Sequence, residues 1–188
     1  MKETKETEER RNEFIDAAEK LFKENGIVDT TINAIVKELD VAKGLFYYYF
    51  KSKDDVIDAI SDKYNNEFCA AIQKAMSGED DFDERLQKFI EEAIASFRVM
   101  WDNLHGVNDD IDLTILSSRS LEEAKETATK TLAKLFEEGN ELHRTNVPNP
   151  DYFAKMIVSG MADLASHTEA DLKEICRMIE EMIRKAGK

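Results

Sequence analysis

Apolar residues recur at intervals of three and four positions along most of this 188-residue chain. No stretch alternates apolar and polar residues in the way that a half-buried strand does. The three-to-four spacing places an apolar face on each of a series of helices. Only two prolines and seven glycines interrupt the pattern. The sequence therefore predicts an all-α protein.

Capping and breaking residues divide the chain into about nine expected helices. A helix over 8–24 ends at Gly26, and Thr31 is a suitable cap for a short second helix. After a tight turn at Asp40, a third short helix is expected over 42–50. Two of the later helices are expected to begin at Ser52 and Phe82, and the next two are expected over 110–116 and 120–142. The last two are expected to begin at Asn149 and Thr168. The expected architecture is three helices in front, followed by a larger bundle.

Charge is unevenly distributed along this acidic chain. The net charge is −14, which argues against a general nucleic-acid binder that depends on overall electrostatic attraction. From Val41 to Lys53, however, there are lysines and no acidic residue. A local cationic face on an acidic body is therefore compatible with the total.

The window "AKGLFYYYFKSK", residues 42–53, holds five consecutive aromatic residues. On a helical wheel Phe46, Tyr49 and Phe50 share one arc, so these rings are expected to pack inward. A small core does not enclose five rings from one short helix, so Tyr47 and Tyr48 are expected to face outward. Two short helices joined by a tight turn and followed by lysines match a helix-turn-helix. The alternative is an aromatic core helix flanked by solvated lysines, and physical reasoning alone leaves both open.

The residue types of this window suit a DNA surface. A tyrosine ring packs on a sugar or a thymine methyl group while its hydroxyl group hydrogen-bonds a phosphate. Gly44 removes a side chain where a helix and a duplex come close. Lys53 lies in the first turn of the next helix, where its ammonium group and the helix dipole favour an anion.

The segment "TTINAIVKELDVAKGLFYYYFKSKDDV", residues 30–56, resembles the amino-terminal DNA-binding domain of the tetracycline-repressor (TetR) family of bacterial regulators. The whole resemblance extends over residues 9–60. The resemblance implies phosphate contacts from Thr31, Tyr47, Tyr49 and Lys53. It implies base-edge or groove contacts from Asn33, Ala42, Lys43, Gly44 and Tyr48.

Several positions depart from the family pattern. Asn33 stands where Arg is common, which favours adenine over guanine. Leu45 replaces a hydroxyl residue and Ala42 replaces a capping Ser, while Tyr49 replaces His and keeps a phosphate donor. Asp40 takes the place of a turn glycine. These departures affect the expected operator sequence.

The resemblance also implies a homodimer formed through a four-helix bundle from the last two helices of each subunit. Both helices have apolar stripes, and the candidate interface residues are Phe153, Met156, Ile157, Gly160, Met161, Leu164, Leu172, Ile175, Cys176, Ile179, Met182 and Ile183. The alternative is that both stripes pack within one subunit.

The resemblance assigns residues 1–52 to the helix-turn-helix domain and 53–188 to effector binding and dimerisation. A small-molecule pocket is lined mostly by apolar and aromatic groups. The candidate lining residues are Tyr64, Phe68, Phe97, Met100, Trp101, His105, Ile115 and Phe136, with Trp101 and His105 preferred. Each of these has plain core packing as its alternative.

Taken together, the sequence predicts a homodimeric TetR-type transcriptional regulator. It is expected to be a repressor that binds a palindromic double-stranded operator and is released by a small-molecule effector. A helical ligand-binding or interaction module without DNA binding is the alternative. The sequence contains no glycine-rich nucleotide loop, no metal-ligand spacing and no nucleophile motif, so no enzyme activity, cofactor or metal is expected. Cys69 and Cys176 lack a pairing pattern, and no segment is apolar enough for a membrane, so a cytoplasmic protein is expected.

Overall fold

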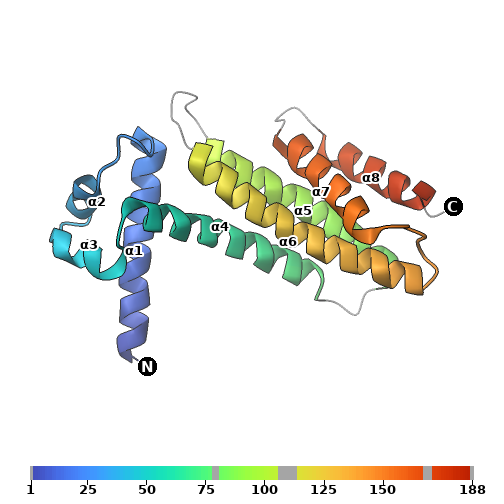
Figure 1. Cartoon of the computed structure of the whole chain (residues 1–188), viewed down its shortest axis with the longest axis horizontal. Coiled ribbons are helices and arrows are strands. Elements are labelled where there is room, and N and C mark those ends of the chain that lie inside the picture. Colours follow the sequence, from blue (N-terminus) through green and yellow to red (C-terminus); the bar gives the residue numbers. More distant parts are fainter. Residues whose placement is uncertain (1, 78–80, 106–113, 167–170, 187–188) are drawn as a thin grey trace. The chain divides into compact units, whose positions relative to one another are not determined.

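A computed structural model of the protein describes residues 2–77, 81–105, 114–166 and 171–186, without the side chains of residues 2–4, 104, 105, 184 and 186. These ranges hold eight helices and no strand (Figure 1). The helices are α1 (Lys2–Asn25), α2 (Ile32–Glu38), α3 (Lys43–Tyr49), α4 (Lys53–Ala75), α5 (Phe82–His105), α6 (Thr114–Glu141), α7 (Pro150–Ser166) and α8 (Leu172–Ala186). The all-α prediction is confirmed.

Two predicted helix boundaries were wrong. The first helix begins at Lys2 rather than at residue 8. The predicted helices over 110–116 and 120–142 are not separated at Ser120, because α6 runs without a break from Thr114 to Glu141. Ser120 is buried inside that helix rather than capping it. No glycine or proline lies between Thr114 and Ser120, so nothing stops the helix there. Residues 110–113 lie outside the described ranges.

Other predicted caps are confirmed. The Thr31 side chain accepts a hydrogen bond from the Ala34 amide at 3.1 Å, and the Asn149 side chain accepts one from the Tyr152 amide at 3.0 Å. Asp40 adopts a left-handed φ of 51° between α2 and α3, as expected for the residue that replaces a turn glycine. Thr168, the predicted start of the last helix, lies outside the described residues.

The chain divides into two compact units. The amino-terminal unit contains residues 1–64 and 103–119, and the carboxy-terminal unit contains residues 65–102 and 120–188. Residues 53–64 of α4 therefore belong to the first unit and residues 65–75 to the second. This division concerns packing, and the functional division after residue 52 stays a prediction.

Aromatic rings form the core of the amino-terminal unit. In Figure 1 the short helices α2 and α3 lie beside α1, and α2 contacts both of the others. Phe14 of α1 is fully buried, and its ring lies 5.9 Å from that of Phe46, 5.7 Å from that of Tyr49 and 6.3 Å from that of Phe50. Close aromatic pairs of this kind contribute about 0.5–1.5 kcal/mol each beyond their buried area. The end of α3 is thus held against α1.

The carboxy-terminal unit is a helical bundle with an apolar centre. Phe89, Ile90, Ile94 and Phe136 are fully buried. Arg85 of α5 pairs with Glu138 of α6, while Arg98 of α5 donates a hydrogen bond to the Ala165 carbonyl of α7. No helix in the described ranges has both the length and the hydrophobicity required to cross a lipid bilayer.

A polar cluster joins α1 to α4 within the amino-terminal unit. The Glu19 carboxylate accepts hydrogen bonds from Lys23 Nζ (2.6 Å), Tyr64 Oη (2.6 Å) and Lys63 Nζ (2.9 Å). Burial alone raises the pKa of Glu19, but these hydrogen bonds outweigh burial and lower the pKa from 4.5 to about 2. Partial burial lowers the pKa of Lys63, and hydrogen bonds to Asp16 and Glu19 more than offset this and raise it.

We expect Glu19→Gln to lower the free energy of unfolding by about 1–2 kcal/mol at pH 7, a value that allows for solvent screening. Because the folded-state pKa is depressed, the stabilisation is present above pH 4.5 and is lost as the pH falls toward about 2. Urea unfolding at a series of pH values would measure this. The wild-type and Glu19→Gln curves should converge at low pH. The exposed Glu24→Gln is the control, and an equal loss in that variant would show that Glu19 has no special role.

Candidate nucleic-acid interface

The helix α3 divides its aromatic side chains between the core and solvent. Phe46 and the capping residue Phe50 are buried and Tyr49 is half-buried, whereas Tyr47 is 50% exposed and Tyr48 is 72% exposed. This is the division predicted from the helical wheel, so that prediction is confirmed. Two tyrosine side chains are thus available to a binding partner.

The exposed rings are supported by rings beneath them. Tyr47 lies edge-to-face against Phe46 with centroids 5.5 Å apart, and Tyr48 against Tyr49 at 4.8 Å. The Lys43 ammonium group lies 6.0 Å from the centroid of the Tyr47 ring. Rings held in place lose little conformational entropy on binding a partner.

The other predicted groove residues lie on α2 and at the start of α3. Asn33 of α2 and Ala42, Lys43 and Gly44 at the start of α3 are exposed. A Cβ atom added to Gly44 would meet no other atom within 4 Å. The surface there is therefore open, as close approach of a duplex requires. Thr31 is exposed too, and its hydroxyl oxygen already accepts the Ala34 amide hydrogen bond. Its O–H donor is free to bind a phosphate.

Lys53 is placed differently from the simple anion site that the sequence suggested. Its ammonium group donates to three backbone carbonyl oxygens: that of Ile27 at 2.6 Å, of Thr30 at 3.0 Å and of Val28 at 3.4 Å. These carbonyls belong to the segment between α1 and α2. Lys53 therefore ties the first turn of α4 to the loop that precedes the helix-turn-helix. The residues that accept its hydrogen bonds lie 23–26 positions away in sequence, so spacing gave no signal of this role.

The predicted effector residues divide between the two units. Phe68, Phe97, Met100 and Phe136 are buried in the carboxy-terminal unit, and the Phe68 and Phe97 rings lie 4.9 Å apart. Trp101 is half-buried in the same unit. In the amino-terminal unit Tyr64 is buried and hydrogen-bonded to Glu19, whereas Ile115 is 51% exposed. The side chain of His105 lies outside the described residues.

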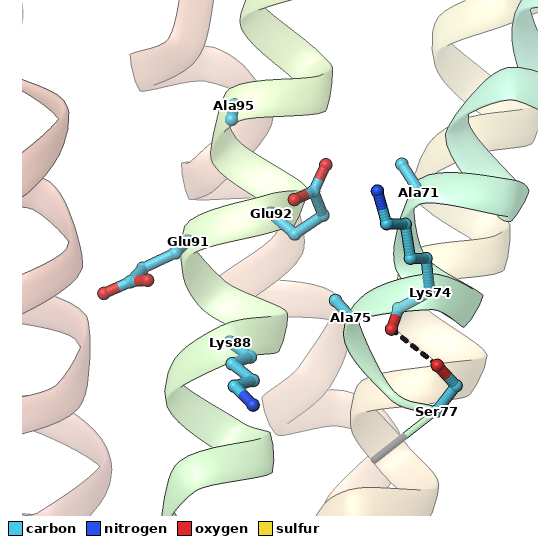
Figure 2. Close-up of a pocket in the computed structure, with 8 residues that line it drawn as sticks. All are labelled: Ala71, Lys74, Ala75, Ser77, Lys88, Glu91, Glu92 and Ala95. Carbon is cyan, nitrogen blue, oxygen red and sulfur yellow. Dashed lines mark hydrogen bonds between the residues drawn. The ribbon is translucent and has the colours of Figure 1, made fainter.

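A groove of about 640 Å³ lies between the end of α4 and α5 in the carboxy-terminal unit (Figure 2). It is lined by Ala71, Lys74, Ala75, Ser77, Lys88, Glu91, Glu92 and Ala95, none of which was predicted. Figure 2 shows Lys74 and Glu92 extending into the space between the two helices, while Glu91 points away from α4. Open mixed-charge walls differ from the mostly apolar lining of typical small-molecule sites. No cluster of three potential metal-binding side chains occurs in the described ranges.

The predicted dimer residues fall into an inward and an outward set. Ile157, Met161, Ile175, Ile179 and Ile183 are buried within the chain itself, so they offer no area to a partner. Phe153, Leu172 and Cys176 are half-buried, and burial raises the pKa of the Cys176 thiol. The predicted residues Met156, Gly160, Leu164 and Met182 are exposed, as are Tyr152 and Met178, which were not predicted. The outward stripe is defined here as Tyr152, Met156, Gly160 and Leu164 of α7 with Met178 and Met182 of α8. Its members are four residues apart on each helix and so share one face.

Comparison with known proteins agrees with this geometry. The sequence model described as "Bacterial regulatory proteins, tetR family" matches residues 14–60. The chain is 52% identical over 50 residues to the regulator HbdR of Aromatoleum sp. (strain CIB), covering 27% of this chain and 22% of that protein. It is 32% identical over 88 residues to the uncharacterized regulator YvdT of Bacillus subtilis, covering 47% of this chain and 45% of that protein. The matched segments thus span less than half the length of either curated relative.

Solved structures resemble the chain over nearly its whole length. A TetR/AcrR-family regulator from Thermobifida fusca has a TM-score of 0.71 at 20% identity and covers 96% of this chain and 99% of its own. The regulator FadR of Bacillus subtilis, solved in complex with stearoyl-CoA, has a TM-score of 0.64 at 19% identity, covering 93% of this chain and 97% of its own. At such identities the likeness concerns the fold alone. Residues 14–60, which include the helix-turn-helix, thus match the TetR family of bacterial regulators in sequence, and the solved structures share the all-α fold over nearly the whole chain.

Proposed function

We propose that the protein is a homodimeric repressor that binds a palindromic DNA operator through α2 and α3 and leaves it when a small-molecule effector binds. The single observation that carries the proposal is the exposed Tyr47–Tyr48 face of α3, with Lys43 beside it, on a rigid aromatic core. Rings with hydroxyl groups and an ammonium group on a short helix suit phosphate and groove contacts.

The proposed interface has two parts. Thr31, Tyr47 and Tyr49 contact phosphates, while Asn33, Ala42, Lys43, Gly44 and Tyr48 face base edges and the groove. Lys53 contributes mainly by holding the loop before α2 in place, because its ammonium group is bound to three carbonyls. The domain division after residue 52 and a cytoplasmic location are parts of the same proposal.

Selection of duplexes from a random library by the purified protein tests this function. The selected sites should contain an inverted repeat whose half-site centres lie ~34 Å, or a multiple of it, apart. Affinity should fall steeply as salt concentration rises. Asn33→Ala should change the preferred bases within the half-site while leaving binding to unrelated duplexes unaltered. Recovery of no repeat, together with binding that is independent of salt, would favour a helical module that does not bind DNA.

Lys53→Ala is expected to lower the free energy of unfolding by about 1–3 kcal/mol, because two partly buried hydrogen bonds and one exposed hydrogen bond to backbone carbonyls lose their charged donor. It should weaken binding to selected and unrelated duplexes by similar factors, since loop position and charge act independently of base sequence. Thermal unfolding and fluorescence anisotropy would measure the two effects. Lys51→Ala removes an exposed lysine two positions earlier and should leave stability unchanged. Equal stability of both variants would refute this role of Lys53.

We propose that the outward stripe of α7 and α8 forms the dimer contact. Met156 is 67% exposed and Met182 is 48% exposed, which is unusual for methionines on a surface without a partner. Met156→Glu and Met182→Glu should each weaken dimerisation by roughly 100-fold, because each removes two buried methionines per dimer and places like charges together.

Sedimentation velocity over a range of concentrations would measure this dimerisation. Val99→Glu is the matched control, since Val99 is 58% exposed on α5 and lies outside the stripe. If both methionine variants remain dimeric, another surface forms the contact.

We propose that the effector binds within the carboxy-terminal unit. The solved complex of Bacillus subtilis FadR with stearoyl-CoA supports ligand binding by this fold in general. The candidate lining side chains in this unit are Phe68, Phe97, Met100, Trp101 and Phe136.

A further inference from the structure

An arginine on α1 contacts the end of α3. The Arg11 guanidinium lies over the Phe50 ring, with Cζ 4.9 Å from the ring centroid. Phe50 is the residue that ends α3, and its ring also packs on Phe14 and Phe46. Arg11 is therefore held beside the carboxyl-terminal end of the helix that we propose to lie in the major groove.

The donors of Arg11 are unused. In the described part of the chain no hydrogen bond and no ion pair involves the Arg11 side chain, although its neighbour Arg10 pairs with Glu13. A guanidinium stacked on a ring keeps its N–H groups in the plane at its edge, where they are free to bind an oxyanion. Arg11 is only half-buried, so that edge is accessible.

The position of Arg11 relative to α3 suits a phosphate. The seven residues of α3 span roughly 10 Å, and the major groove is ~12 Å wide. Groups beside either end of the helix therefore come close to the phosphate strands that border the groove. The exposed Lys51 follows Phe50 directly and adds a second positive charge at this end.

We infer that Arg11 is a phosphate-binding residue outside the helix-turn-helix, aligned by stacking on Phe50. The inference rests on the proposed DNA binding and adds a contact from α1 to it. The competing account is structural: a cation at the carboxyl end of α3 stabilises that helix through its dipole and through the ring, with no role in binding.

Salt dependence separates the two accounts. We expect Arg11→Met, which keeps an apolar stem and removes the charge, to weaken binding to a duplex selected by the wild-type protein by roughly 10-fold per subunit. The slope of log affinity against log salt should become less steep by about 1.8, at ~0.9 for each of two lost contacts in a dimer. Arg11→Lys should retain the slope. Arg10→Met is the control on the same helix and should retain it too.

Chemical modification provides a second test that does not depend on folding of a variant. Phenylglyoxal should modify Arg11 in the free wild-type protein, and the bound duplex should protect Arg11 but not Arg10, as measured by mass spectrometry of peptides. An unchanged salt slope in folded Arg11→Met, or no protection of Arg11, overturns the inference while the proposed function stands. A wild-type protein that binds no duplex overturns both.

Discussion

Replacing Phe46 by alanine is expected to lower the free energy of unfolding of the amino-terminal unit by about 3–5 kcal/mol. Phe46 is fully buried, and its ring contacts the rings of Phe14, Tyr47 and Phe50. The substitution leaves a cavity where those three rings meet. Since a small domain has only ~5–15 kcal/mol of stability, much of this unit should unfold, and DNA binding should be lost with it.

Amide hydrogen exchange resolved by residue would measure the effect, because it separates the amino-terminal unit from the rest of the chain. Protection over α1, α2 and α3 should fall sharply. Tyr48→Ala is the control, since it removes a ring of similar size from the same helix at a site that is 72% exposed. That variant should change stability by no more than ~0.5 kcal/mol. Equal protection in both variants would mean that Phe46 is not central to this core.

The double substitution Tyr47→Ala/Tyr48→Ala is expected to weaken operator binding by roughly 100- to 1000-fold while leaving the fold intact. A dimer loses four exposed tyrosine side chains, and each of them, ring and hydroxyl group together, contributes about 0.7–1 kcal/mol. Stability should hardly change, because both side chains are at least half exposed.

Fluorescence anisotropy with a selected duplex would measure this loss, with circular dichroism as the check on folding. The double substitution Tyr47→Phe/Tyr48→Phe keeps the rings and removes only the hydroxyl groups. It should lose an intermediate amount of affinity if the rings pack on sugars while the hydroxyl groups bind phosphates. Wild-type affinity in the double alanine variant would exclude this face of α3 from the interface.

Residues near one another in sequence allowed most of the fold to be predicted. The apolar spacing, the Thr31 and Asn149 caps and the turn at Asp40 act over a few positions, so the sequence alone indicated them. The helix break predicted at Ser120 was wrong because it, too, depended on a local pattern alone. A Ser followed by Glu three positions later is a capping pattern, but it also occurs inside a helix that nothing interrupts.

The candidate site was predicted in part. The outward direction of Tyr47 and Tyr48 follows from helical geometry, whereas the partners of Lys53 and Arg11 do not. Lys53 binds carbonyls 23–26 positions earlier, and Arg11 stacks on a ring 39 positions later. The same holds for Tyr64, a candidate pocket residue, which donates a hydrogen bond to Glu19, 45 positions away.

The sequence by itself determined that the chain is helical, that a helix-turn-helix lies near its start and that two tyrosines of α3 face outward. Only the tertiary structure decided which charged side chains are hydrogen-bonded within the protein and which can bind a partner. It also decided which methionines of the last two helices face outward, since Met161 is buried and Met156 is exposed. The physical reason is the distance along the sequence between the residues that interact. Helical periodicity and caps depend on neighbours within about four residues, while burial, ion pairing and stacking depend on segments that only folding brings together.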